Sequence, residues 1–209
     1  YEELYTVDVL CHGVPSPAVW QRYCGEQEKA HRDKLSGVSF RDKVTGWKTC
    51  SVAMGFKGGA RYCVRNSKDP YMKMFLGDIC LRPSCHSCRF KDIPRLSDLT
   101  IGDAWGIQKH MPDMDDDRGT SVVLVNSEKG RRLWEEVNNN IISRRGELDV
   151  LLSPDADSRK SVRRHPNRKR FFEALERGES LEQLQKLARK PGLRRLLSFG
   201  KRQIKRLLR

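Results

Sequence analysis

Three cysteines within nine residues constrain this chain more than any other feature of its sequence. Cys80, Cys85 and Cys88 form the run C-x4-C-x2-C. Thiolates at these spacings can converge on one metal centre, and the combination is typical of iron–sulfur sites that take a fourth cysteine from elsewhere. Cysteines this close together are poorly placed to form separate disulfides that would staple a chain of 209 residues. The run therefore predicts a metal centre, and its spacing favours iron–sulfur.

Cys11 is the predicted fourth ligand. It follows a strand-like stretch and precedes a turn with Gly13 and Pro15, where a loop can expose a sulfur atom. The other cysteines lie in helix-like or strand-like stretches and are expected to be structural: Cys24, Cys50 and Cys63. The spacing leaves two alternatives open. One is a structural zinc ion held by three cysteines together with Cys11 or His86, and the other is a set of cysteines that binds no metal.

The composition indicates a reducing compartment, so we expect a cytoplasmic protein. Seven cysteines are an odd number, and outside the run they are scattered. No apolar run approaches the ~20 residues that span a bilayer. The first ten residues, YEELYTVDVL, carry acidic residues where a signal peptide needs basic ones, and the chain does not begin with Met. We therefore expect a fragment of a longer protein, with no membrane span.

The positive charge of the chain lies mainly in its C-terminal part. Residues 151–209 contain 18 Lys and Arg against 6 Asp and Glu, which accounts for +12 of the total charge of +14. The pattern predicts a domain over 1–153 and a basic helical extension over 154–209. The extension is expected to be solvated or docked on a partner, and a surface helix on an anionic membrane is the less favoured alternative. Nucleic acid is disfavoured as a partner because the extension has only three aromatic residues on which bases could stack: Phe171, Phe172 and Phe199.

Strand-like and helix-like stretches alternate, which predicts an α/β fold, with α+β as the alternative. Strands are expected over 5–10, 37–43, 49–56, 60–66, 99–103, 119–126 and 148–152. Helices are expected over 17–29, 70–79, 127–140, 168–178, 180–190 and 193–209. Gly58 and Gly59 between two strands indicate a hairpin. The order strand, helix, strand over 119–152 predicts a βαβ unit in a mixed sheet with flanking helices.

Five blocks of sequence, in matching order, resemble the C-terminal domain of the coenzyme F420 hydrogenase/dehydrogenase beta subunit family. The blocks are VDVLCHGVPSPAVW (7–20), FRDKVTGW (40–47), YMKMFLGDICLRPSCHSCRF (71–90), SDLTIGDAWGI (97–107) and DDRGTSVVLVNSEKG (116–130). The resemblance covers roughly residues 5–150. It implies that Cys11, Cys80, Cys85 and Cys88 hold a [4Fe–4S] cluster, that FAD is bound, and that coenzyme F420 is a candidate substrate.

Candidate flavin contacts come from the residue pattern, and the resemblance adds weight to the first group. Gly102, Asp103, Trp105 and Gly106 come directly after a buried strand, where ligands of α/β proteins bind, and the Trp105 ring could stack near a flavin. A turn with a packed Trp is the alternative for this group. Arg41 and Lys43, with Trp47 close by, could bind a phosphate or an acidic substrate tail, although an ordinary charged hairpin explains them too. Asp98 could contact a cofactor, but capping the turn before the strand is the favoured role.

The sequence thus supports two hypotheses of different classes. The first is an iron–sulfur flavoprotein oxidoreductase subunit that passes electrons between a [4Fe–4S] cluster, FAD and a soluble acceptor such as coenzyme F420 or another small-molecule redox substrate. Its partners would be a ferredoxin-like domain or an electron-transfer protein, and a homo-oligomer is compatible with the sequence. The second is a non-catalytic interaction module stabilised by zinc, with a basic docking tail.

Overall fold

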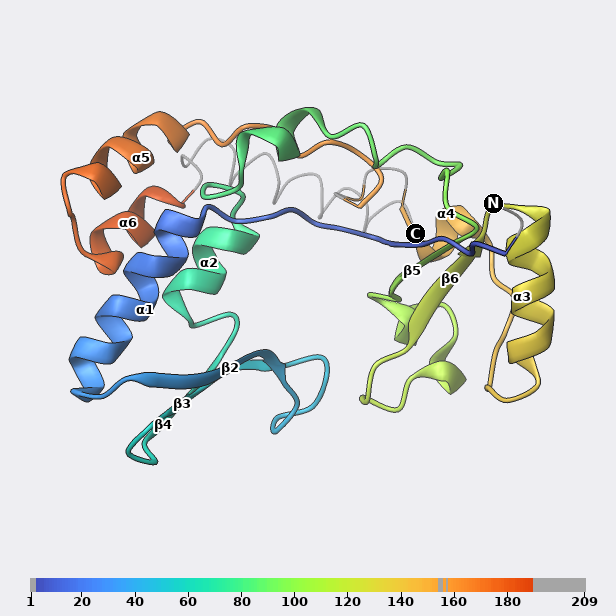
Figure 1. The fold of residues 1–209 in the computed structure, drawn as a ribbon, viewed down its shortest axis with the longest axis horizontal. Helices are drawn as coiled ribbons and strands as arrows, with labels where there is room; N and C mark the ends of the chain where they lie inside the picture. Colours follow the sequence, from blue (N-terminus) through green and yellow to red (C-terminus); the bar gives the residue numbers. More distant parts are fainter. Residues whose placement is uncertain (1–2, 154–155, 157, 190–209) are drawn as a thin grey trace, which may run out of the picture. The chain divides into compact units, whose positions relative to one another are not determined.

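A computed structural model describes residues 3–153, 156 and 158–189, and its chain divides into two compact units (Figure 1). The first unit consists of Tyr1–Val14, Arg41–Ser51 and Pro83–Val162, and the second of Pro15–Phe40, Val52–Arg82 and Arg163–Arg209. Each unit is therefore assembled from three separate stretches of the chain. The domain boundary predicted at residue 153 stays a prediction.

The second unit contains most of the three-stranded sheet β2-β3-β4. The strands are β2 (Leu35–Asp42), β3 (Ser51–Phe56) and β4 (Arg61–Arg65). The predicted hairpin is present between β3 and β4, where Gly59 has a φ of +90° and its N–H donates to the Phe56 carbonyl over 3.0 Å. A positive φ is easily adopted only by glycine, so the two glycines were a reliable turn indication.

Four helices supply the other side of the second unit's core: α1 (Pro17–His31), α2 (Pro70–Leu76), α5 (Arg168–Glu176) and α6 (Leu181–Leu187). The first residues of three of these helices are of the types that favour a helix start. α1 and α2 have proline at their first position, and the Ser180 hydroxyl caps α6. α6 packs against α1, α2 and α5.

Two helices of the predicted basic extension are integral to this core. Phe171 and Ala174 of α5 and Leu181 and Leu184 of α6 are at most 5% exposed and join the same apolar cluster as Val52 and Met54. The expectation of a solvated extension is therefore wrong for these helices, because each has an apolar stripe that the core buries. The third predicted helix, over 193–209, lies outside the described residues.

The first unit is built on the three-stranded sheet β1-β5-β6. β1 (Val7–Val9) pairs in parallel with β5 (Leu99–Asp103), and β5 pairs antiparallel with β6 (Ser121–Val125). The predicted mixed sheet is thereby confirmed, and so is the α/β class. Helix α3 (Glu128–Asn138) follows β6, and the Ser127 hydroxyl accepts the Gly130 N–H as its cap (Figure 1).

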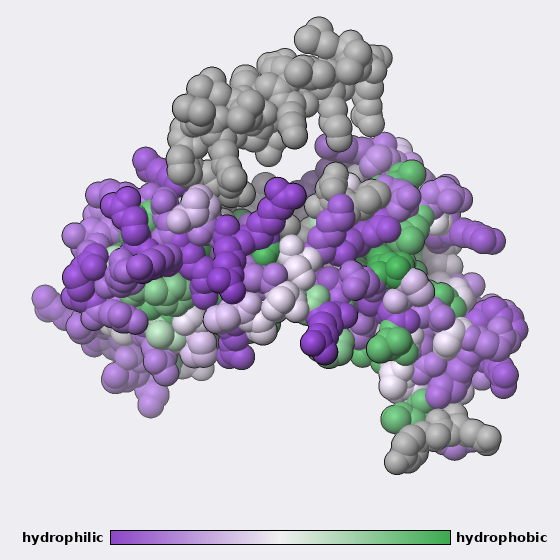
Figure 2. All heavy atoms as spheres, turned by 90° about the horizontal axis from the view of Figure 1, so that it is seen from above, coloured by the Kyte–Doolittle hydropathy of each residue, from purple (hydrophilic) through white to green (hydrophobic). Residues whose placement is uncertain are grey.

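The two faces of this sheet have different surroundings. One face contributes Val122 and Leu124 to a small core with Ala104, Ile107 and Leu152. The opposite face is also apolar, but several of its side chains stay 41–59% exposed: Val7, Val9, Ile101 and Val125. Figure 2 shows hydrophobic residues scattered over a mainly hydrophilic surface.

The predicted strand over 148–152 is wrong. Residues Leu148–Leu151 form the short helix α4, so the predicted βαβ unit is also absent. Leu148, Leu151 and Leu152 pack against the small core of the first unit, whereas Val150 is 47% exposed. A spacing of three and four residues fits one turn of helix, and a short apolar run cannot distinguish that turn from a strand.

In the described part of the chain, none of the helices is both long enough and apolar enough to cross a bilayer.

Candidate functional site

Two of the predicted ligands, Cys85 and Cys88, lie in the first unit around a short 3₁₀ helix, η1 (Pro83–Ser87). Cys85 is 6% exposed, and its Sγ accepts the Val14 N–H over 3.2 Å. A backbone N–H directed at sulfur stabilises a thiolate, and metal centres bind cysteine in that form. The surroundings of Cys85 therefore fit a ligand.

The loop that carries Cys11 lies directly against the cysteine run. Val14, three residues after Cys11, makes the hydrogen bond to Cys85, and the Lys91 ammonium donates to the His12 carbonyl over 2.7 Å. Cys11 also follows β1 at the carboxyl edge of the parallel pair, because Val9 is opposite Ile101. Ligands of open α/β sheets bind at this edge. The structure thus brings Cys11 to the loop system of Cys85 and Cys88.

Cys80 has different surroundings. It belongs to the second unit, is completely buried and forms part of that unit's apolar core. Its carbonyl accepts the Ser16 N–H over 2.8 Å. Burial raises the pKa of its thiol to about 12. A thiol in such surroundings keeps its proton at neutral pH unless a metal displaces it.

The full ligand set is not assembled in the structure. Among residues 3–153, 156 and 158–189, no three His, Cys, Asp or Glu side chains are grouped so that they could hold a metal ion. Three of the predicted ligands belong to the first unit and Cys80 to the second. The four-cysteine set therefore stays a prediction.

His86 lies between Cys85 and Cys88 in the sequence. One of its ring nitrogens forms a hydrogen bond, and the other forms none in the part of the chain that the structure describes. Its Nδ1 lies 2.8 Å from the Val162 carbonyl oxygen, so Nδ1 carries the proton and donates it. Its Nε2 is buried and has no hydrogen-bond partner among the described residues. Metal-binding histidines commonly have this arrangement, with one nitrogen held by a carbonyl and the other available.

A second candidate site is an aromatic and cationic surface that we call the tryptophan platform: Arg41, Lys43, Trp47, Asp103 and Trp105. The Trp47 and Trp105 rings stack at 5.0 Å with an interplanar angle of 14°. The Arg41 guanidinium lies 5.1 Å from the Trp47 ring centre and forms an ion pair with Asp103. The Lys43 ammonium lies 5.1 Å from the Trp47 ring centre. All five residues belong to the first unit.

Two glycines allow Trp47 to reach this position. Gly46 has a φ of +86°, and a Cβ there would lie 2.1 Å from the Asp117 carboxylate. Gly119 has a φ of +103°, and a Cβ there would lie 3.0 Å from the Trp47 ring. The Trp47 N–H donates to the Asp117 carbonyl over 2.9 Å. The turn at 46–47 is thus held against residues 117–119, and side chains larger than hydrogen do not fit.

A small cavity of about 140 Å³ opens beside the platform. Its walls come from Trp47, Lys48, Ala104, Trp105, Gly106, Ile107, Gln108, Asp115 and Thr120. Pockets that enclose a drug-sized ligand have volumes of roughly 300–1,000 Å³. The cavity can therefore take one ring or one phosphate, and it is too small for a whole flavin dinucleotide.

The remaining predicted contacts are explained by packing. Asp98 accepts the Thr6 N–H and hydroxyl over 2.8 Å each and the Ser127 hydroxyl over 2.6 Å, so it ties β1 and α3 to the start of β5. A Cβ at Gly102 would lie 2.7 Å from the Leu10 side chain. These contacts support the favoured capping role of Asp98, and the cofactor role of both residues stays a prediction.

The sequence did not single out several residues of the cavity. These are Lys48 and Asp115, which form an ion pair of 2.5 Å, and Gln108, which also lines the cavity. Residues 108 and 115–120 are far from Trp47 in the sequence, so only the tertiary structure brings them together. Gly46 and Gly119, each with a φ that favours glycine, were the local indications of a close approach.

A comparison with protein families identifies the chain. Residues 1–148 match the family model that describes the C terminus of the coenzyme F420 hydrogenase/dehydrogenase beta subunit. The chain belongs to this family. The resemblance noted in the sequence is thereby confirmed, and with it the relation to an oxidoreductase subunit. No curated protein matches the chain.

Proposed function

We propose that this chain is an iron–sulfur flavoprotein subunit that passes electrons between a [4Fe–4S] cluster, FAD and a soluble acceptor. Coenzyme F420 is the acceptor that the family name suggests, and another small redox substrate is compatible with the same site. The proposed cluster ligands are Cys11, Cys80, Cys85 and Cys88. A cytoplasmic location and a ferredoxin-like partner belong to the same proposal.

The contact between two cysteine loops is the observation that carries the proposal. The Val14 N–H donates to the Cys85 sulfur, which joins the Cys11 loop to the cysteine run, although the two are 71 residues apart. An N–H directed at sulfur is a contact that a metal-bound thiolate can keep. The contact therefore supports Cys85 as a ligand and places the loop that carries Cys11 against the cysteine run.

When bound, the cluster would supply one-electron transfer, and the flavin would exchange single electrons for a hydride. The residues of this chain would hold and orient both groups. Lys91 fixes the Cys11 loop through the His12 carbonyl. Trp105, which is 56% exposed, offers one ring face. Arg41, paired with Asp103, lies 5.7 Å from the Trp105 ring centre, and the Lys43 ammonium lies over the neighbouring Trp47 ring. Because the cavity is small, we propose contact with only the flavin ring or one phosphate.

Substitution of single cysteines tests the proposal. Protein purified without oxygen is expected to be brown and to contain about four iron and four sulfide per chain. Cys11→Ser should abolish or destabilise the cluster, because serine replaces one of four thiolates. The matched control is Cys63→Ser, at an exposed position of β4, which should keep the iron content of the parent. Cys24→Ser and Cys50→Ser should keep it too. Equal iron in the Cys11 variant and the parent would show that Cys11 is not a ligand.

The arrangement of His86 favours zinc as a second candidate. The buried, unused Nε2 on the cysteine loop is the nitrogen that a zinc ion would take, which fits a non-catalytic, zinc-stabilised module. Metal analysis after anaerobic reconstitution distinguishes the two. Colourless protein with one zinc per chain, lost in His86→Ala, would establish the zinc module. Brown protein in which His86→Ala retains its iron would exclude it.

A further inference from the structure

The longest strand of the second unit's sheet lies at the edge of that sheet and is exposed. β2 comes first in the strand order β2-β3-β4, so its outer side has no neighbouring strand in the part of the chain that the structure describes. Every residue from 36 to 40 is exposed, with Val38 at 38% and Phe40 at 39%. An edge strand presents N–H and C=O groups to which a further strand can be added.

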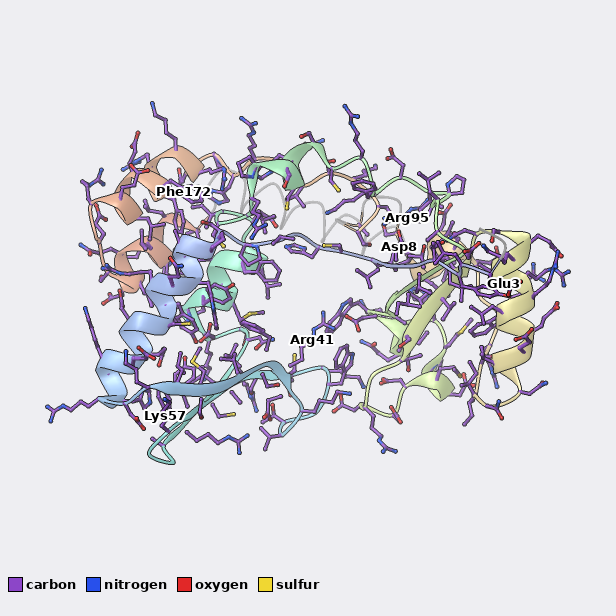
Figure 3. The ribbon with its side chains drawn as sticks, in the orientation of Figure 1. Glu3, Asp8, Arg41, Lys57, Arg95 and Phe172 are labelled. Carbon is purple, nitrogen blue, oxygen red and sulfur yellow. The ribbon has the colours of Figure 1, made fainter. Side chains whose placement is uncertain are left out.

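The hydrogen bonds at the start of β2 indicate which residues direct their backbone groups outward. The Lys34 carbonyl accepts the N–H of Lys57, which follows the last residue of β3, over 2.9 Å (Figure 3 labels Lys57). The Leu35 N–H instead donates to a glutamate carboxylate of α1 over 3.1 Å. Consecutive residues of a strand direct their N–H and C=O groups to alternate sides. Gly37 and Ser39 therefore direct theirs away from β3, to the open side.

The opposite edge strand of the sheet has features that discourage pairing, and β2 lacks them. β4 is shorter, and its two end residues are the exposed Arg61 and Arg65. Short length and charged side chains are the usual protection of an edge strand. Residues 35–40 of β2, LSGVSF, contain neither a charged residue nor proline. Of the two edges, the one at β2 is therefore the one suited to pairing.

The sequence of β2 is complementary to itself in the antiparallel direction. In a two-fold pairing centred on Val38, Gly37 lies opposite Ser39 of the second copy, so outward backbone groups meet on both sides of the axis. The same register places Lys34 opposite Asp42 at both ends, and within the strand no like charges oppose each other. Lys34 stays 73% exposed while it pairs with a glutamate of its own chain.

We propose that β2 pairs with β2 of a second copy of this chain, which joins the two sheets across a two-fold axis at Val38. Backbone hydrogen bonds of Gly37 and Ser39 supply the affinity, as in other cases of strand addition, and the two Val38 side chains meet at the axis. One strand edge buries less than the roughly 1,200–2,000 Å² of a stable interface, so the dimer should dissociate on dilution. The inference goes beyond the proposed function and does not depend on the cysteine ligands.

Sedimentation velocity of the full 209-residue chain over a range of concentrations tests the pairing. A reducing agent prevents a disulfide between copies through the exposed Cys63. The parent should change from monomer to dimer as the concentration rises. Val38→Lys places two ammonium groups opposite each other at the axis and should raise the dimer Kd about tenfold or more. Ser39→Pro removes an outward N–H without breaking the ladder with β3, and should weaken the dimer likewise.

Two control variants should dimerise as the parent does. Cys63→Lys introduces the same charge at an exposed position of the opposite edge strand, β4. Ser39→Ala keeps the N–H that Ser39→Pro removes. Circular dichroism of each variant checks that it is folded. A parent that stays monomeric at every concentration, which would leave the edge to a strand of another protein, would overturn the proposal. So would a dimer that Val38→Lys and Ser39→Pro leave unchanged, or one that Cys63→Lys weakens equally.

Discussion

At the scale of single residues, Asp98 was a candidate cofactor contact, and its carboxylate forms hydrogen bonds that join distant segments of the chain. Its carboxylate accepts the Thr6 N–H and hydroxyl and the Ser127 hydroxyl, and Lys129 lies 3.8 Å away. The hydrogen bond from Ser127 and those from Thr6 lower its pKa from an ordinary value of 3.8 to about 2. The charged form is therefore the one that the folded protein stabilises.

The lowered pKa of Asp98 predicts a pH dependence of stability. The folded value, about 2, lies below that of the unfolded chain, about 3.9. The contribution of Asp98 to the free energy of unfolding should be complete above pH about 4 and should be lost as the pH falls to about 2. Urea unfolding between neutral and acid pH measures this. Asp98→Asn should flatten the loss in that range, whereas Asp113→Asn, in an exposed ion pair, should not. Identical pH profiles for the parent and Asp98→Asn would contradict the prediction.

At the scale of elements, α2 depends on one carboxylate that performs two tasks. Asp69 is completely buried. One of its oxygens accepts the Met72 N–H over 2.8 Å and thereby caps the helix. The other accepts the Tyr23 hydroxyl over 2.5 Å and the Tyr62 hydroxyl over 2.8 Å. Asp69 therefore fixes the start of α2 and links it to α1 and β4.

Asp69→Ala should destabilise the protein by about 3 kcal/mol or more. Loss of a helix cap costs ~1 kcal/mol, and buried hydroxyls left without a partner cost ~1–3 kcal/mol. The matched control is Ser180→Ala, which removes the exposed cap of α6 and should cost only about 1 kcal/mol. Urea unfolding compares the two. Losses of similar size would show that the tyrosines contribute nothing through Asp69.

At the scale of the whole molecule, each unit combines stretches from distant parts of the sequence. α5 and α6 begin more than 80 residues after β4, yet they complete the same core as β3 and α1. The basic composition of this part of the chain reflects the exposed side chains of α5 and α6. The apolar stripe of each helix determines which core the helix packs against. The family match ends at residue 148, before both helices.

Phe171→Ala tests whether α5 is integral to the second unit. Phe171 is completely buried in the core, so its truncation should cost about 3–5 kcal/mol. Lys169→Ala, on the exposed face of the same helix, should change the free energy of unfolding by no more than about 0.5 kcal/mol. Chemical unfolding of both variants provides the measurement. A small effect of Phe171→Ala would mean that α5 is solvated, as its charge suggested.

The sequence determined those features whose cause is local. Pro17, Pro70 and Ser127 mark helix starts because they suit positions where backbone N–H groups lack partners. Gly58 and Gly59 indicated the hairpin because glycine adopts the turn's backbone angles. The strand over 99–103 was predicted with its exact bounds, and the cysteine spacing and ordered blocks indicated the family.

Only the tertiary structure decided features that depend on distant neighbours. Residues 148–151 are helical because of the core against which they pack, and the apolar run alone suited a strand equally well. The stack of Trp47 on Trp105 and the contact of Val14 with Cys85 join segments 58 and 71 residues apart. Among residues 90–96, two cations are buried and two apolar side chains are exposed, which opposes the usual rule of burial. Composition and periodicity describe single elements, so they could not specify which distant segments meet or which side chains are thereby buried.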